Sequence, residues 1–114
     1  MGYYTYFEME MENLNDESSV TEEEVVKTLI EESDWFDWAD GEKDFDGLFN
    51  DSLKWYDWED DMKRVSLSFP NVVFTLMGRG EEYDDLWKCY FYKGKSFYSP
   101  AKIIYDEPPM SFFE

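Results

Sequence analysis

Residues 72–105 read VVFTLMGRGEEYDDLWKCYFYKGKSFYSPAKIIY, and this stretch decides the fold. It contains three runs rich in β-branched and aromatic residues, a composition typical of strands. The runs are residues 72–77, 86–92 and 97–105. Between the second and third runs, Lys93-Gly94-Lys95 predicts a tight turn. The last third of the chain is therefore predicted to form a three-stranded antiparallel meander.

A fourth strand is predicted over residues 3–12, where apolar and acidic side chains alternate. The apolar side chains are those of Phe7, Met9 and Met11, and the acidic ones are those of Glu8, Glu10 and Glu12. This alternation is the pattern of a strand with one buried face and one solvated face. The polar residues 13–19 that follow are predicted to form a turn.

Two helices are predicted between the first strand and the meander. The first helix begins after Thr21, because a threonine followed three residues later by Glu24 is a capping-box pattern. The second helix begins at Asp57, where Asp57 and Asp60 are expected to cap it, and Phe69-Pro70-Asn71 ends it. Apolar residues at three-and-four spacing define the buried faces. These residues are Val25, Val26, Leu29 and Ile30 in the first helix, and Trp58, Met62, Val65 and Phe69 in the second.

Residues 34–52 form an insert between the helices that fits neither a regular strand nor a clean helix. The insert holds seven acids interleaved with aromatic residues, and a connection of this length is more often functional or mobile than ordinary. Residues 53–56 allow an additional short strand. The chain, residues 1–114, is therefore predicted to be a single α+β domain. Its antiparallel sheet has about four strands with two helices packed on one face, in the order β-α-(β)-α-β-β-β.

Charge is distributed unevenly along the chain. Residues 1–61 hold 21 acids against Lys27, Lys43 and Lys54, whereas residues 62–114 hold seven acids and seven bases. The net charge of −18 therefore belongs to the first half. A hydrophobic content of 43% is too high for a disordered acidic chain, so we expect a folded protein with an electrostatic surface suited to recognition.

The residue types present restrict the chemistry. The chain has no histidine and a single cysteine, Cys89, which lies in an aromatic segment and is predicted to pack in the core of a cytoplasmic protein. Without histidine, a Ser-His-Asp or Cys-His set is excluded and zinc is disfavoured. Residues 42–47 match the first half of a calcium loop, but Leu53 occupies the position that needs a bidentate glutamate. We therefore expect no enzymatic activity, no cofactor and no membrane segment.

Several short motifs indicate a family. They are Gly2-Tyr3-Tyr4-Thr5-Tyr6, Lys54-Trp55-Tyr56-Asp57, Phe69-Pro70-Asn71-Val72, Gly78-x-Gly80-Glu81-Glu82 and Asp85-x-Trp87-x-x-Tyr90-Phe91-x-x-Gly94-Lys95. Outside the insert, the chain resembles a group of small bacteriophage and mobile-element proteins without an assigned activity. The resemblance implies a phage context, in which small acidic proteins often act as anti-CRISPR or anti-restriction mimics of nucleic acid. Trp58 stands where a histidine commonly occurs in that family, so no role of that histidine transfers to this chain.

The spacing of the carboxylates carries the functional hypothesis. Alternate strand residues lie about 6.8 Å apart, so the three glutamates of the first strand resemble successive phosphates of one nucleic-acid strand. Each such pair of like charges opposes folding by on the order of 0.5 kcal/mol in water before salt screening, which selection for stability would not favour. Two tryptophans of the insert are expected to anchor the contact. The predicted partner contacts are Glu8, Glu10, Glu12, Glu22, Glu23, Trp35, Asp37, Trp38, Asp40, Asp44 and Asp46.

Two functions remain open from the sequence. In the first, the protein inhibits a host defence nuclease or another nucleic-acid-binding protein by occupying its basic channel. In the second, it is a structural or assembly protein that binds a basic or apolar partner, including a second copy as a homodimer. A plainer interpretation is that the glutamates only solvate a strand face and a helix. Direct nucleic-acid binding is not expected, because the basic and aromatic group around Lys88, Tyr90 and Lys95 is too small to offset the acidic half.

Overall fold

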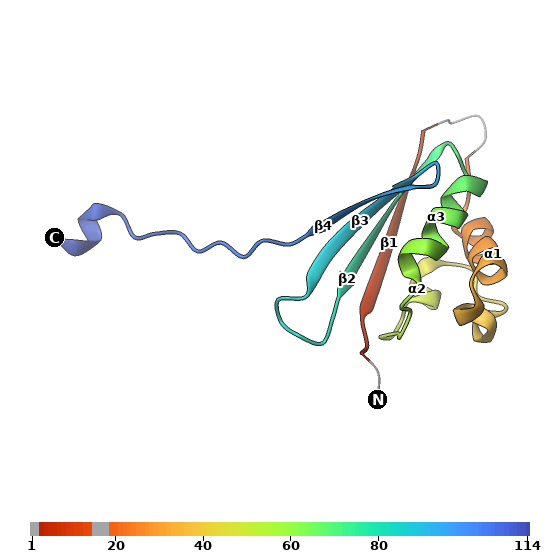
Figure 1. Ribbon diagram of the computed structural model, residues 1–114, viewed down its shortest axis with the longest axis horizontal. Coiled ribbons are helices and arrows are strands. Elements are labelled where there is room, and N and C mark those ends of the chain that lie inside the picture. The colour runs from red at the N-terminus through yellow and green to blue at the C-terminus, as the bar shows by residue number, and fades with distance from the viewer. Residues whose placement is uncertain (1–2, 15–18) are drawn as a thin grey trace.

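The computed structural model describes residues 3–14 and 19–114 and shows an α+β fold with a four-stranded antiparallel sheet (Figure 1). The fold class predicted from the sequence is confirmed. The strands are β1 (Tyr6–Asn13), β2 (Val72–Arg79), β3 (Leu86–Tyr92) and β4 (Lys95–Pro100), in the spatial order β1-β2-β3-β4. The turn predicted at residues 13–19 falls largely on residues 15–18, which lie outside the described residues.

The β3–β4 hairpin forms at the predicted turn. Tyr92 pairs with Lys95, and the two residues between them, Lys93 and Gly94, have positive φ angles of 51° and 79°. Two consecutive left-handed residues match the twist of a tight hairpin. β4 ends at Pro100, so the prediction of a strand as far as Tyr105 was wrong. The reason is that β3 begins at residue 86, opposite the end of β4, and offers no further backbone partner.

The two long helices begin and end near the predicted residues. α1 (Glu22–Glu32) begins after Thr21, whose hydroxyl accepts a hydrogen bond of 3.3 Å from the Glu24 N–H. α3 (Trp58–Ser68) follows Asp57, but the Asp57 side chain makes no capping hydrogen bond. That part of the prediction was wrong, because Asp57 has φ −90° and ψ 24° and lacks the extended backbone of a typical N-cap. α3 packs on β2, β3 and β4, and α1 packs on α3.

The insert at residues 34–52 forms two short helices, a 3-10 helix η2 (Asp34–Ala39) and an α-helix α2 (Phe45–Leu48). The phenylalanines of the insert, Phe36, Phe45 and Phe49, are all buried. Phe36 packs edge-on against buried Trp55, with ring centroids 4.8 Å apart. The insert therefore supplies part of the core. The short strand allowed at residues 53–56 is reduced to a single bridge between Leu53 and Thr5.

The packing of β2 against β3 depends on a glycine. A Cβ atom on Gly78 would lie 2.1 Å from the indole ring of Trp87, so the ring occupies the space above the backbone of β2. Trp87 in turn stacks on Trp58 of α3, with centroids 4.2 Å apart and an interplanar angle of 17°. This contact joins the sheet to the helices, which Figure 1 shows gathered on one side of it.

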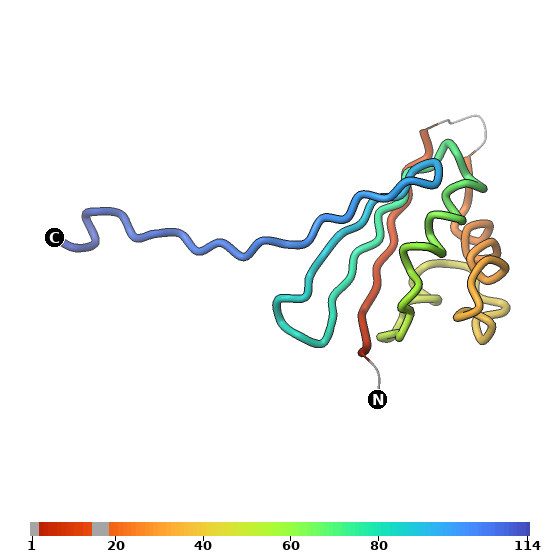
Figure 2. Tube along the Cα trace, viewed as in Figure 1, coloured from red at the N-terminus to blue at the C-terminus, as the bar shows by residue number. Residues whose placement is uncertain are grey.

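Beyond β4 the chain leaves the domain as an extended segment, residues 101–114, which we name the arm (Figure 2). The arm ends in a 3-10 helix, η3 (Met110–Phe113), and all of its residues are exposed. The radius of gyration is 17.4 Å, against about 13 Å expected for a compact domain of this length. The arm therefore accounts for the elongated shape.

Candidate interaction surface

The face of the sheet opposite the helices carries the first candidate surface, which we name the open face. Its residues alternate along each strand with residues of the core. They are Tyr6, Glu8, Glu10 and Glu12 on β1, Val73, Thr75, Met77 and Arg79 on β2, Leu86, Lys88, Tyr90 and Tyr92 on β3, and Lys95, Phe97 and Ser99 on β4. The row of three glutamates predicted on β1 therefore lies on this face.

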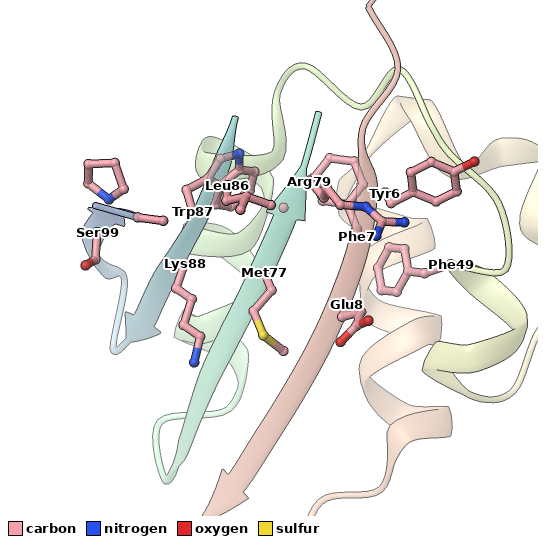
Figure 3. Close-up of a pocket in the computed structure, with 13 residues that line it drawn as sticks. Tyr6, Phe7, Glu8, Phe49, Met77, Arg79, Leu86, Trp87, Lys88 and Ser99 are labelled. Carbon is pink, nitrogen blue, oxygen red and sulfur yellow. The ribbon is translucent and has the colours of Figure 1, made fainter. Parts of the chain in front are cut away.

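Charge changes sign across the open face. In one cross-strand row, Glu8 on β1 is followed by Met77 on β2 and Lys88 on β3. In the next row, Glu10 is followed by Thr75 and then by Tyr90 on β3. Figure 3 shows the side chains of Glu8, Met77 and Lys88 projecting to the same side of the sheet. The face therefore runs from acidic at β1, through largely neutral side chains and Arg79 at β2, to basic and aromatic at β3 and β4.

The second candidate surface, which we name the acidic flank, consists of the predicted acidic contacts on β1, α1 and the insert. All of these side chains are exposed. They are Glu8, Glu10, Glu12, Glu22, Glu23, Asp37, Asp40, Asp44 and Asp46. In Figure 1, β1, α1 and α2 lie at the end of the molecule remote from the arm. The acids therefore lie at this end of the molecule, with the row of β1 on the open face and the other acids on the helix side of the sheet.

Within the flank, the acids fall into separate groups. Glu8, Glu10 and Asp46 line one depression of about 440 Å³ beside β1. Glu23 and Asp40 line another, of about 300 Å³, between α1 and the insert. The structure therefore brings strand and insert carboxylates together at the edge of the sheet.

Two acids of the flank have roles inside the chain that sequence reasoning missed. The N–H of Phe45 donates to Glu22 Oε1 at 2.8 Å, and the N–H of Gly47 donates to Asp44 Oδ1 at 2.7 Å. These carboxylates cap the start of α2, where backbone N–H groups lack helical partners. The capping pattern also accounts for the calcium-like sequence of residues 42–47. Among the described residues, no three acidic or cysteine side chains lie close enough together to hold a metal ion.

The two predicted anchors, Trp35 and Trp38, are 37% and 53% exposed. Both lie on η2, where residues three apart occupy the same side of a 3-10 helix. The opposite side carries Phe36 and Ala39, which are buried. The insert therefore divides its aromatic residues, with phenylalanines in the core and two indoles at the surface beside the acids.

Very few of the acids are neutralised within the chain. Among residues 3–14 and 19–114, Arg64 is the one basic residue in an ion pair, with Glu32 at 3.7 Å and with Asp61. Lys27, Lys43 and Lys54 of the acidic half make no ion pair in that part of the chain. Within the described residues, the carboxylates of the acidic flank therefore form no ion pair with a base, although Lys27 and Lys43 line the same depression as Glu23 and Asp40.

Asp61 is the exception, and sequence reasoning did not single it out. It is 4% exposed and accepts hydrogen bonds from Ser33 Oγ at 2.5 Å and Trp55 Nε1 at 2.7 Å, besides its contact with Arg64. This buried cluster of hydrogen bonds around Asp61, which we name the Asp61 node, joins the end of α1, the segment before α3 and α3 itself. One signal was present in the sequence, because Asp61 follows Trp58 by three residues and adjoins Met62 on the buried stripe.

Parts of four of the five motifs that carry the phage resemblance meet at one end of the sheet, and Phe69-Pro70-Asn71-Val72 lies at the other end. The Tyr3 hydroxyl donates to Asp85 Oδ2 at 2.6 Å, and the Tyr4 N–H donates to a Glu81 carboxylate oxygen at 2.7 Å. The hydrogen bond with Asp85 raises the pKa of the Tyr3 hydroxyl. A Cβ on Gly80 would lie 2.0 Å from Asp85 Oδ2, so a larger residue there would displace the Asp85 carboxylate from the Tyr3 hydroxyl. These motifs hold the segment before β1 against the β2–β3 connection and therefore have a structural explanation.

Cys89 is buried in β3, as predicted. Burial, and to a smaller extent the nearby charge of Glu59, raise the pKa of the Cys89 thiol to about 11. A thiol is a nucleophile only when deprotonated, so Cys89 is unsuited to chemistry at neutral pH.

Comparisons of the chain with protein-family models, curated proteins and solved structures give no match. The relation to bacteriophage and mobile-element proteins therefore stays a prediction from the motifs. In the part of the chain that the structure describes, every helix is too short or too polar to cross a bilayer.

Proposed function

We propose that this protein acts by binding, and that its acidic flank occupies the basic surface with which another protein holds nucleic acid. The observation that supports this most strongly is the lack of internal neutralisation. Of the described acids, only Glu32 and Asp61 form ion pairs with a base. A basic partner would relieve the repulsion among the remaining carboxylates, and this gain is available only on binding.

The arrangement of the flank suits such a partner in two ways. The row of Glu8, Glu10 and Glu12 presents charges at a spacing of about 6.8 Å along an edge strand, so it fits a groove that tracks a phosphate backbone. Trp35 and Trp38 add exposed apolar area beside the charges. The charges accelerate encounter, while the indoles slow dissociation by filling pockets on the partner.

The motif resemblance gives the proposal a biological setting. In that setting, the protein is a phage-encoded inhibitor of a host defence nuclease, or of a related nucleic-acid-binding protein, and acts in the host cytoplasm. The buried, protonated Cys89 is compatible with a reducing compartment. The inhibitor itself needs no catalytic group, because blocking the channel is sufficient.

A second candidate function is supported by the open face. Phe97 and Tyr90 are 67% and 39% exposed with ring centroids 6.3 Å apart, on a surface that the helices leave uncovered. Clustered exposed aromatic side chains are typical of protein–protein contacts. In this alternative, the protein is an assembly component that binds through the sheet.

Capture from a bacterial lysate at low salt, followed by elution with duplex DNA, tests the first proposal. The informative variant replaces Glu8, Glu10 and Glu12 with glutamine, which removes the row while keeping the side-chain size. The matched control, Glu82→Gln/Asp84→Asn/Glu107→Gln, removes the same charge from exposed sites outside the flank. We expect wild type and control to capture a protein that DNA displaces, and the row variant to capture much less. Equal capture by the row variant, or a captured protein that DNA does not displace, contradicts the proposal.

A further inference from the structure

The arm is rich in large apolar side chains, which is the composition of a segment that packs against another surface. Residues 101–114 include large apolar side chains that are more than half exposed. They are Ile103, Ile104, Tyr105, Met110, Phe112 and Phe113, with exposed fractions between 52% and 85%. Exposed apolar side chains concentrated in one segment mark an interaction site.

The arm does not cover the domain from which it comes. It leaves the sheet at the end of β4 and points away from the helices and from the other strands (Figures 1 and 2). Its last hydrogen bond to the sheet is that of the Ala101 N–H with the Leu86 carbonyl oxygen, at 2.8 Å. The apolar side chains beyond that point are therefore available to another molecule.

A suitable receptor lies on the open face, next to the root of the arm. A groove of about 500 Å³ runs across the strands there, and its lining includes Met77, Leu86 and Lys88 as well as residues 99–101 (Figure 3). Grooves of this volume accommodate a few side chains. Because the arm starts in the wall of the groove, each molecule presents the donor and the acceptor side by side.

The charges of the groove and the arm are complementary. The groove is lined by two bases, Arg79 and Lys88, and one acid, Glu8, so its net charge is positive. Neither base makes an ion pair in the described part of the chain. The arm carries Asp106 and Glu107 between its two apolar segments. These acids would meet the basic side of the open face, where the overall negative charge of the protein is locally reversed.

We propose that the occupant of the groove is the arm of a second copy of this chain, and that two copies exchange arms about a two-fold axis. A two-fold arrangement is self-complementary, so one arm–groove contact generates the other. Three aromatic side chains per arm bury roughly 150–250 Å² each, so two arms and their grooves approach the roughly 1,600 Å² of a stable interface. The groove and the acidic flank share Glu8, but the arm itself carries no residue of the flank, so the two proposals can be tested with separate variants.

Arm exchange predicts a response to salt opposite to that of nucleic-acid mimicry. Two chains of net charge −18 repel each other, and the contact itself is largely apolar. Raising NaCl from about 50 mM to about 500 mM screens the repulsion, so dimerisation should hold or strengthen. Binding of the acidic flank to a basic partner should weaken over the same range. The failure of one proposal can therefore be told from the failure of the other.

Sedimentation equilibrium of the full chain and three variants tests the proposal. The arm variant is Ile104→Ser/Phe112→Ser/Phe113→Ser, and the groove variant is Leu86→Arg. The matched control is Leu14→Ser, an exposed apolar residue at the end of β1 remote from the groove. Circular dichroism checks that each variant is folded. We expect wild type and control to dimerise. The dimer dissociation constants of the arm and groove variants should be higher by roughly 30-fold or more.

Mixing the arm and groove variants decides whether the arm enters the groove. The groove variant keeps a normal arm and the arm variant keeps a normal groove, so the mixture should form a mixed dimer held by one contact. Wild type that stays monomeric at about 100 μM, or an arm variant that dimerises like wild type, overturns the proposal. A mixture that stays monomeric also overturns it, because the arms would then contact each other or another surface.

Discussion

Asp61 and the glutamate row of β1 show the same chemical group in opposite environments. Asp61 is buried and accepts hydrogen bonds from Ser33, Trp55 and Arg64. The glutamates of the row lie on the open face and have no basic partner among the described residues. A buried charge is tolerated only with such partners, whereas an exposed charge needs none. Asp61 therefore contributes to stability, and the row is free to contribute to binding.

The largest expected effect comes from removing the carboxylate of the Asp61 node. Asp61→Ala leaves the Trp55 N–H and the Ser33 hydroxyl without acceptors, and should lower the free energy of unfolding by about 3 kcal/mol. Urea denaturation followed by tryptophan fluorescence measures the change. Asp60→Ala is the matched control, because Asp60 is the preceding residue of α3 and is exposed, and it should cost about 0.5 kcal/mol or less. If both substitutions lowered the free energy of unfolding equally, the buried position of Asp61 would not be the source of its contribution to stability.

A second large effect is expected where the sheet is packed most tightly. Gly78→Ala places a methyl group where the Trp87 indole lies, and should destabilise the protein by about 2 kcal/mol. Displacement of Trp87 should also loosen its stacking on Trp58 and shift the emission maximum to longer wavelength. Thermal unfolding and fluorescence spectra check the two expectations. An unchanged melting temperature would show that the ring has room to move.

Cys89 extends the comparison to a buried group that is neutral. Its pKa is raised in the folded state to about 11, from an ordinary value of 9.0, so the folded protein holds the proton more tightly than the unfolded chain. The resulting stabilisation is fully present below pH 9 and is lost as the pH rises through about 11. Urea midpoints of wild type and Cys89→Ala, measured at intervals across this range, isolate the effect from other groups. Wild type should lose stability more steeply than the variant, and parallel curves would contradict the assignment.

The smallest effect is expected in the glutamate row. Replacing Glu8, Glu10 and Glu12 with glutamine removes neighbouring like charges and should raise the melting temperature by about 2 °C or less at low salt. The gain should disappear at high salt, because screening already removes the repulsion. Differential scanning calorimetry at two salt concentrations checks this. A lower melting temperature would show that the row has a structural role.

Local patterns predicted the regular elements of this fold well. The Thr21 cap, the stripe of Met62 and Val65 in α3, and the Lys93-Gly94 turn each depend on residues close together in sequence. The end of β4 was missed because it depends on where its partner strand begins. The composition of residues 101–105 does not show whether a partner strand extends far enough to pair with them.

The candidate surface was predictable in part. Strand alternation placed the glutamate row on the solvated face, and the two tryptophans of η2 are exposed. The burial of Phe36 and Phe45 was not predictable, because the insert has no regular period from which a buried side could be inferred. The capping roles of Glu22 and Asp44 depend on a contact between α1 and α2 that only the tertiary structure reveals.

Photo-crosslinking in a bacterial lysate tests the central claim most directly, which is that the acidic flank is a binding surface for a basic partner. A photo-reactive amino acid is placed at Glu10 in the flank, at Trp38 beside it, or at Asp84, an exposed acid outside it. We expect the Glu10 and Trp38 positions to capture the same basic protein, and added duplex DNA to abolish the capture. Capture at Asp84 alone, or capture at Glu10 that DNA leaves unchanged, would contradict the central claim.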